Sequence, residues 1–166
     1  MNFLHQLVPS FSTAFFLHLQ NLIMSQLRLP FTTLSPAAYH GLLATSKALS
    51  ESSLGLPMVE LIYLRISQIN GCSFCLGKHS STLRDSGVAQ RKLDQLAGWR
   101  VSELFDARER AALAWAETLT HVSEQGAPDE RYAPLKALFS DAEISDLTLA
   151  IALMNAFNRL AIGMLL

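Results

Sequence analysis

The sequence is poor in charged residues, and those it has form no basic block. Only 16% of its 166 residues are charged, and the formal net charge is −1. A chain without a basic patch lacks the surface that binds nucleic acid or an anionic membrane, so neither is an expected partner. Half of the residues are hydrophobic, which is ample for the core of one domain and favours a homo-oligomer that covers apolar surface.

Cysteine is also scarce, and the two that occur, Cys72 and Cys75, are only three positions apart. A secreted disulfide framework would use more cysteines and would join distant segments of the chain. A close pair in an otherwise cysteine-free chain indicates redox chemistry or half of a metal site. Both interpretations fit a reducing compartment, so we expect a cytoplasmic protein.

We do not expect residues 1–23 to act as a secretory signal or a membrane span. Residues 1–23 contain no Lys or Arg, so the charged start of a secretory signal is absent, and their apolar stretch is too short and too interrupted to span a bilayer. We interpret residues 1–33 as an N-terminal arm of uncertain order and residues 34–166 as a single domain.

The apolar run 147–166 is interrupted by Asn155, Asn158 and Arg159. Polar and charged residues are costly inside a bilayer, so the run predicts a buried core helix rather than a membrane span. Asn155 and Arg159 share one helix face, and a buried Arg needs an acidic partner or several carbonyl groups. We expect a structural or subunit-interface role for these polar residues.

Strand-like alternation, internal repeats and low-complexity linkers are all missing, and the hydrophobic pattern is helical throughout. The sequence therefore predicts an all-α fold, an antiparallel bundle of about six to seven helices. Ser140 with Glu143 forms a capping box at one helix start, and Asp106 with Glu109 forms an Asp-led relative. The expected helices cover 35 to about 50–53, 58–70, 72–87, 89–97, 106–125, 129–139 and 140 to near the C-terminus.

One segment places several reactive side chains around the cysteine pair. Cys72 and Cys75 lie at an expected helix start, where unpaired amides and the helix dipole stabilise a thiolate and lower a thiol pKa from its free value of about 8.5. On a helix the two cysteines share a face, near enough to close a disulfide after small adjustments. His79 falls on the same face, four residues after Cys75, and can take the thiol proton. Glu60 on the preceding helix can hold the imidazole or a water and complete a proton relay.

These residues predict a two-thiol peroxide cycle. Cys75 as thiolate attacks the peroxide O–O bond and becomes a sulfenic acid. Cys72 then condenses with the sulfenic acid to form a disulfide and release water. An external dithiol must reduce that disulfide by exchange. No cofactor or metal is needed for any of these steps.

The spacing resembles a known family. A Glu, eleven intervening residues, Cys-x-x-Cys, three residues and a His, together with the ending 154–163, is similar to the alkylhydroperoxidase D-like branch of the carboxymuconolactone decarboxylase-like superfamily. The likeness covers roughly 34–166. It implies an all-α fold that assembles into trimers or hexamers, with Cys75 as the peroxide-reacting thiol and Cys72 as the resolving thiol. It also implies that Glu60 and His79 form the proton relay.

The resemblance implies an alkyl hydroperoxide as substrate and an external dithiol reductant, which is a lipoyl group, a thioredoxin-like protein or a small thiol. The chain departs from the best-described peroxidases of this type at Phe74, where they carry a second His. An apolar ring cannot move a proton, so this difference concerns the efficiency of peroxide reduction and the choice of reductant.

Three alternatives stay open at this point. The first is a lactone decarboxylase of the wider superfamily, although that chemistry has no evident need for a dithiol. The second is a non-enzymatic helical oligomer that binds a partner. The third is a zinc site, for which a fourth ligand would have to come from His40, His121 or a carboxylate. Both of these histidines, and His5 and His18 in the arm, are weaker site candidates than His79.

Overall fold

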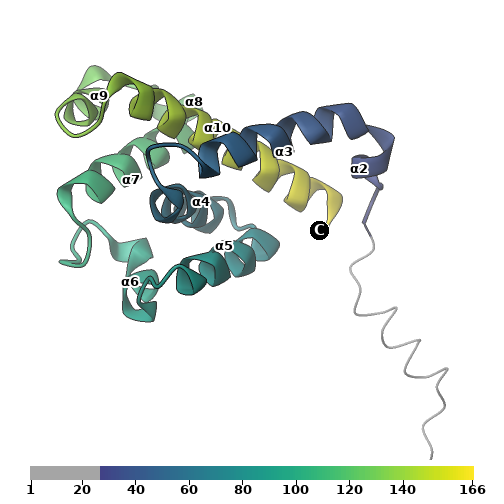
Figure 1. Cartoon of the computed structure of the whole chain (residues 1–166), viewed down its shortest axis with the longest axis horizontal. Coiled ribbons are helices and arrows are strands. Elements are labelled where there is room, and N and C mark those ends of the chain that lie inside the picture. Colours follow the sequence, from purple (N-terminus) through teal and green to yellow (C-terminus); the bar gives the residue numbers. More distant parts are fainter. Residues whose placement is uncertain (1–26) are drawn as a thin grey trace, which may run out of the picture.

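The computed structural model describes residues 27–166, and these residues form a bundle of helices without a strand (Figure 1). The all-α prediction is therefore confirmed. The predicted arm overlaps the first short helix, while His5 and His18 lie outside the described residues. The elements are α2 (Phe31–Leu34), α3 (Pro36–Ser50), α4 (Leu56–Asn70), α5 (Ser73–Asp85), α6 (Gln90–Asp94), the 3₁₀ turn η1 (Leu96–Gly98), α7 (Ala107–Thr120), α8 (Val122–Gln125), α9 (Asp129–Lys136) and α10 (Asp141–Met164).

Both predicted capping boxes are present. The Asp106 side chain accepts a hydrogen bond from the Glu109 amide at 2.8 Å, and the Glu109 carboxylate accepts one from the Asp106 amide at 3.0 Å. Ser140 and Glu143 make the same reciprocal pair at 3.3 Å and 2.9 Å. Each box satisfies amides that a helix leaves unpaired at its first turn, which explains why α7 and α10 begin where the sequence indicates.

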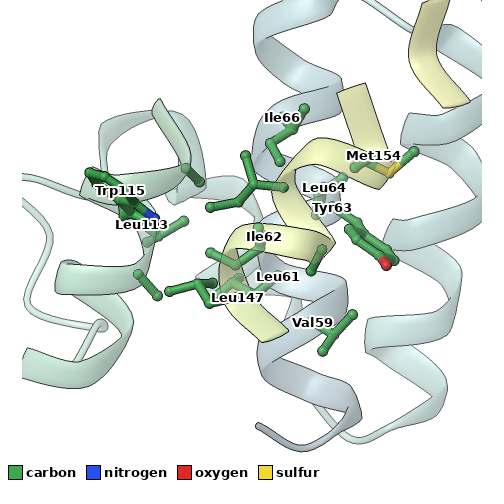
Figure 2. Packing of buried hydrophobic residues seen from close by; sticks show 14 of the residues in the cluster. Val59, Leu61, Ile62, Tyr63, Leu64, Ile66, Leu113, Trp115, Leu147 and Met154 are labelled. Atoms are coloured by element: carbon green, nitrogen blue, oxygen red, sulfur yellow. The ribbon is translucent and has the colours of Figure 1, made fainter. Parts of the chain in front are cut away.

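Helix α4 is the centre of the bundle. It packs against α5, α7 and α10, and in Figure 1 it is seen nearly end-on between them. Its side chains Ile62 and Ile66 are fully buried, as are Leu113 of α7 and Leu147 of α10. Figure 2 shows this aliphatic contact among α4, α7 and α10. Burying such side chains contributes about 1.5–3 kcal/mol each, so the contact fixes α4 relative to both neighbours.

Helix α10 is long and apolar enough, by length and composition alone, to cross a membrane. In the structure it packs against α3, α4 and α7 and buries a continuous set of residues that includes Leu147, Ile151 and Met154. The prediction that this apolar run forms a buried core helix is confirmed.

A buried carboxylate joins α4, α7 and the segment after η1. Glu117 of α7 accepts hydrogen bonds from Arg65 Nε and Trp99 Nε1, both at 2.7 Å, and from Arg100. Burial by itself raises the pKa of Glu117, but the hydrogen bonds from Trp99, Arg100 and Arg65 outweigh it and leave the pKa below its ordinary value. Glu117 therefore stays ionised and holds the surrounding elements together.

Three predicted helix ends are wrong. The helix expected over 129–139 ends at Lys136. The helix expected over 106–125 ends at Thr120, and α8 follows after His121, whose backbone leaves the helical region. Thr120 and Val122 flank the break, and β-branched side chains lower helix propensity. The helix expected over 89–97 is shorter, because α6 ends at Asp94 and gives way to the 3₁₀ turn η1.

Candidate active site at the start of α5

The site begins at the tight turn between α4 and α5. Gly71 ends α4 with φ of 71°, in the left-handed region that glycine enters without a steric penalty. The Cys72 amide donates a hydrogen bond to the Ser67 carbonyl at 3.1 Å, which closes the turn. Cys72 is the N-cap of α5, and its sulfur accepts a hydrogen bond from the Cys75 amide at 3.3 Å. The turn therefore places both cysteines in the first turn of α5, as the sequence predicts.

Cys72 and Cys75 are joined by a disulfide, with their Cα atoms 5.3 Å apart. Both are buried, with 1% and 3% of their surfaces exposed. The structure thus has the pair in its oxidised form. Reduction of this bond would give two thiols within one helical turn, at amides that stabilise a thiolate.

Glu60 and His79 form a buried pair beside the cysteines. Glu60 Oε2 lies 2.7 Å from Nδ1 of His79, and their side chains are 11% and 5% exposed. A carboxylate only accepts hydrogen bonds, so a Glu60 carboxylate would hold the imidazole proton on Nδ1 and leave Nε2 free to accept one. This orientation suits an imidazole that takes a proton from a thiol.

A cavity of about 110 Å³ brings these groups together. Cys75, Glu60 and His79 all line it, whereas Cys72 lines a separate hollow near the C-terminus. The cavity wall has more apolar than polar surface and comes from α2, α3, α4, α5 and α10. Its apolar members include Phe31, Tyr39, Leu43, Phe74, Phe157 and Leu160.

Comparison with known proteins gives the family. The model of the carboxymuconolactone decarboxylase family matches residues 36–118, which span α3 to α7. Over 141 residues the chain is 31% identical to the uncharacterized protein YdfG of Bacillus subtilis, covering 85% of this chain and 95% of that protein. The chain belongs to the carboxymuconolactone decarboxylase family.

Two crystal structures extend the comparison to the fold. A protein of unknown function from Agrobacterium tumefaciens, ATU0492, named as a candidate antioxidant defence protein AhpD, is 36% identical with a TM-score of 0.79, over 84% of this chain and 95% of that one. An uncharacterized peroxidase-related protein from Silicibacter sp. TM1040 is 27% identical with a TM-score of 0.68, over 76% and 68%. The resemblance to alkylhydroperoxidase D-like proteins is thus confirmed for family and fold.

Three asparagines form a hydrogen-bond network between α4 and α10, close to the turn that carries the cysteines. Asn70 Nδ2 donates to the side-chain oxygens of Asn155 at 3.0 Å and Asn158 at 2.9 Å, and Asn158 donates to the Ser67 hydroxyl at 3.2 Å. These bonds tie α10 to the end of α4 just before the Gly71 turn. The structural role expected for Asn155 and Asn158 is therefore observed. Sequence reasoning did not connect them with Asn70, because the partners are distant in the chain.

Arg159 differs from the expectation for a buried charge. It is exposed at the surface of α10, where it donates to the Asn155 carbonyl at 2.9 Å. Its guanidinium therefore keeps its water contact and needs no acidic partner.

The weaker histidine candidates lie outside the cavity. His40 is exposed on α3, and His121 at the end of α7 lies 3.7 Å from Glu124. Within residues 27–166 no group of three or more His, Cys, Asp or Glu side chains is arranged to hold a metal ion. The zinc alternative needed a fourth ligand from His40, His121 or a carboxylate, and the described residues form no such group around the cysteines.

Tyr63 is a cavity residue that the sequence did not reveal. It lies on α4 one turn after Glu60, and its ring contacts the His79 ring edge-on with centroids 5.2 Å apart. In the sequence Tyr63 is one of several large residues at core spacing, and nothing local separates it from them.

Proposed function

We propose that this protein is a thiol-dependent peroxidase that reduces organic hydroperoxides by a cysteine sulfenate–disulfide cycle. One observation carries the proposal. Cys75 lines the same cavity as the buried Glu60–His79 pair, while Cys72 is within bonding distance of Cys75 on the other side. The relatives described as an antioxidant defence candidate and as peroxidase-related agree with this chemistry.

In the first step His79 takes the Cys75 thiol proton on Nε2, and the Glu60 carboxylate stabilises the resulting imidazolium. The thiolate sulfur then attacks the terminal oxygen of R–O–O–H. A sulfur–oxygen bond forms, the O–O bond breaks, and the alkoxide leaves. The alkoxide takes the proton held by His79 and becomes the alcohol, so Cys75 is oxidised to a sulfenic acid.

In the second step the Cys72 sulfur attacks the Cys75 sulfenic acid, which releases water and forms the disulfide seen in the structure. An external dithiol then reduces the disulfide by two exchange reactions, which return both thiols and oxidise the reductant. The proposed reductants are a lipoyl group, a thioredoxin-like protein or a small thiol.

The cavity supports a small organic hydroperoxide as substrate. Its volume of about 110 Å³ is somewhat less than the roughly 150 Å³ that admits benzene in an apolar cavity. The aromatic and aliphatic wall formed by Phe31, Phe74 and Phe157 can bury a short alkyl group. The polar end of the cavity, at Cys75 and His79, then faces the peroxide oxygens.

The family that the chain belongs to takes its name from a lactone decarboxylase, which makes decarboxylation the second candidate function. Glu60 and His79 supply an acid–base pair for such a reaction, but decarboxylation takes no electrons from a thiol. The two candidates therefore differ in their need for Cys72 and Cys75. A double Cys→Ser variant that still converts a muconolactone would favour decarboxylation.

The decisive experiment uses the reduced protein and one equivalent of tert-butyl hydroperoxide. Thiol titration should show rapid loss of two thiols, and the mass of the peptide that contains Cys72 and Cys75 should fall by that of two hydrogen atoms. Cys72→Ser should stop at a Cys75 sulfenic acid that dimedone traps, and Cys75→Ser should not react. Unchanged thiols in the reduced wild-type protein would end the proposal.

A further inference from the structure

The Tyr63 hydroxyl is a buried polar group that the helical bundle leaves without a partner. Tyr63 is 4% exposed, and its oxygen has no hydrogen-bond partner among residues 27–166. Buried tyrosine hydroxyls are usually hydrogen-bonded, and one that is not needs an explanation. Since Tyr63 lines the cavity that contains Cys75 and His79, a molecule bound there is the acceptor that the structure offers.

The neighbours of Tyr63 fix the direction of its ring. Glu60 lies one helical turn earlier on α4, so the two side chains leave the helix on the same face. The Tyr63 and His79 rings meet edge-on at 64°. In Figure 2, Tyr63 and Met154 lie on the opposite side of α4 from Leu113, and both line the cavity. The ring is therefore held between α4 and the imidazole, on the side of α4 that faces the cavity, and its hydroxyl oxygen is closed to solvent.

The hydroxyl is a donor and not a base. Burial, and secondarily the negative charge of Glu60, raise the pKa of Tyr63 well above its ordinary value. The phenol therefore keeps its proton throughout the pH range in which a cysteine thiolate exists.

We propose that Tyr63 is a catalytic residue that donates a hydrogen bond to the leaving oxygen of the hydroperoxide, an inference that rests on the peroxidase function proposed above. When the Cys75 sulfur bonds to the terminal oxygen, the electron pair of the broken O–O bond stays on R–O⁻. A fixed donor at that oxygen stabilises the charge until the proton from His79 neutralises it. Phe74, which also lines the cavity, has no donor to offer.

The test compares two reactions of Cys75 in Tyr63→Phe, which removes only the hydroxyl. Oxidation by tert-butyl hydroperoxide expels a strongly basic alkoxide, whereas alkylation by iodoacetamide expels iodide, which needs no hydrogen-bond donor. Removing one such donor typically slows a reaction by about 10²-fold or more, so we expect a loss of that order in oxidation and none in alkylation. Oxidation by a peracid, whose leaving carboxylate is weakly basic, should lose much less.

Tyr132→Phe is the matched control, because Tyr132 packs on Trp115 away from the cavity; both of its rates should match the wild type. If Tyr63→Phe loses the same factor in the rates of oxidation and alkylation, Tyr63 affects only the reactivity of the Cys75 thiolate, and the inference is overturned. An unchanged oxidation rate would overturn it as well. The melting temperature of Tyr63→Phe should equal or exceed that of the wild type, because an unpartnered hydroxyl is removed. A clear fall would reveal a structural hydrogen bond and overturn the inference as well.

Failure of the underlying function has a different signature. If the wild-type protein is alkylated by iodoacetamide but is oxidised by no hydroperoxide or peracid, the proposed peroxidase function fails, and the role of Tyr63 falls with it. A wild type that is oxidised while Tyr63→Phe is oxidised equally fast removes only the role of Tyr63.

Discussion

Replacing Glu60 by Gln tests whether the buried carboxylate assists proton transfer at Cys75. Glu60 Oε2 lies 2.7 Å from Nδ1 of His79, and both side chains are almost fully buried. Gln keeps the shape of the side chain and an acceptor for the Nδ1 proton, so the substitution mainly removes a negative charge. The imidazolium that forms when His79 takes the thiol proton then has no counter-ion.

The size of the effect follows from the geometry. Opposite charges about 4 Å apart interact by about 4 kcal/mol at an effective dielectric constant of about 20. The amide of Gln recovers part of this through its dipole and hydrogen bond, so we expect a loss of about 2–3 kcal/mol in the activation step. At about 1.36 kcal/mol per factor of ten, this is a decrease of about 30- to 150-fold in the rate of Cys75 oxidation.

The assay is a stopped-flow measurement of thiol loss after mixing reduced protein with tert-butyl hydroperoxide. Glu117→Gln is the matched control. The Glu117 carboxylate is buried to a similar extent and accepts a hydrogen bond from Arg65, and neither residue lines the cavity. Glu60→Gln should oxidise slowly and keep its melting temperature, since neutral His79 still has a partner. Glu117→Gln should oxidise normally and melt earlier. Wild-type kinetics in Glu60→Gln, or equal slowing in both variants, would refute the reasoning.

Three further predictions concern the Gly71 turn, the cavity wall at Phe74 and the carboxylate of Glu117. Gly71→Ala should lower the free energy of unfolding, measured in urea, by about 1–2 kcal/mol, because a backbone φ of 71° is strained for any residue with a side chain. This strain applies although no atom lies within 4 Å of the added Cβ. Unchanged stability would contradict the role of the turn. Phe74→His should raise the rate of hydroperoxide reduction, because it adds a proton carrier at the cavity wall, and a rate no higher than the wild type would show that this position does not limit catalysis. The folded-state pKa of Glu117 lies below its unfolded value, so its stabilisation is present above the unfolded pKa and is lost as pH falls through the folded one. The melting-temperature gap between wild type and Glu117→Gln should therefore narrow as pH falls from 7 toward 3, and a constant gap would argue against the effect.

Local signals in the sequence were reliable wherever the physics is local. The capping boxes at Asp106 and Ser140 depend on atoms three residues apart, so they could be recognised without the fold. The Gly71 turn and the placement of Cys72 and Cys75 in one helical turn depend on the same short range. The break at His121 was missed because no Gly or Pro marks it.

The helical fold and the candidate reactive groups could be predicted from the sequence: a cysteine pair at a helix start, with a histidine at helical spacing and a glutamate on the preceding helix. The packing of the helices places Cys75, and not Cys72, in the cavity with the Glu60–His79 pair. It also places Tyr63, whose buried hydroxyl has no hydrogen-bond partner among residues 27–166, in the wall of that cavity. The cavity is lined by side chains from α2, α3, α4, α5 and α10. Its composition therefore depends on how helices from distant parts of the chain pack together, which is why no local pattern could reveal it.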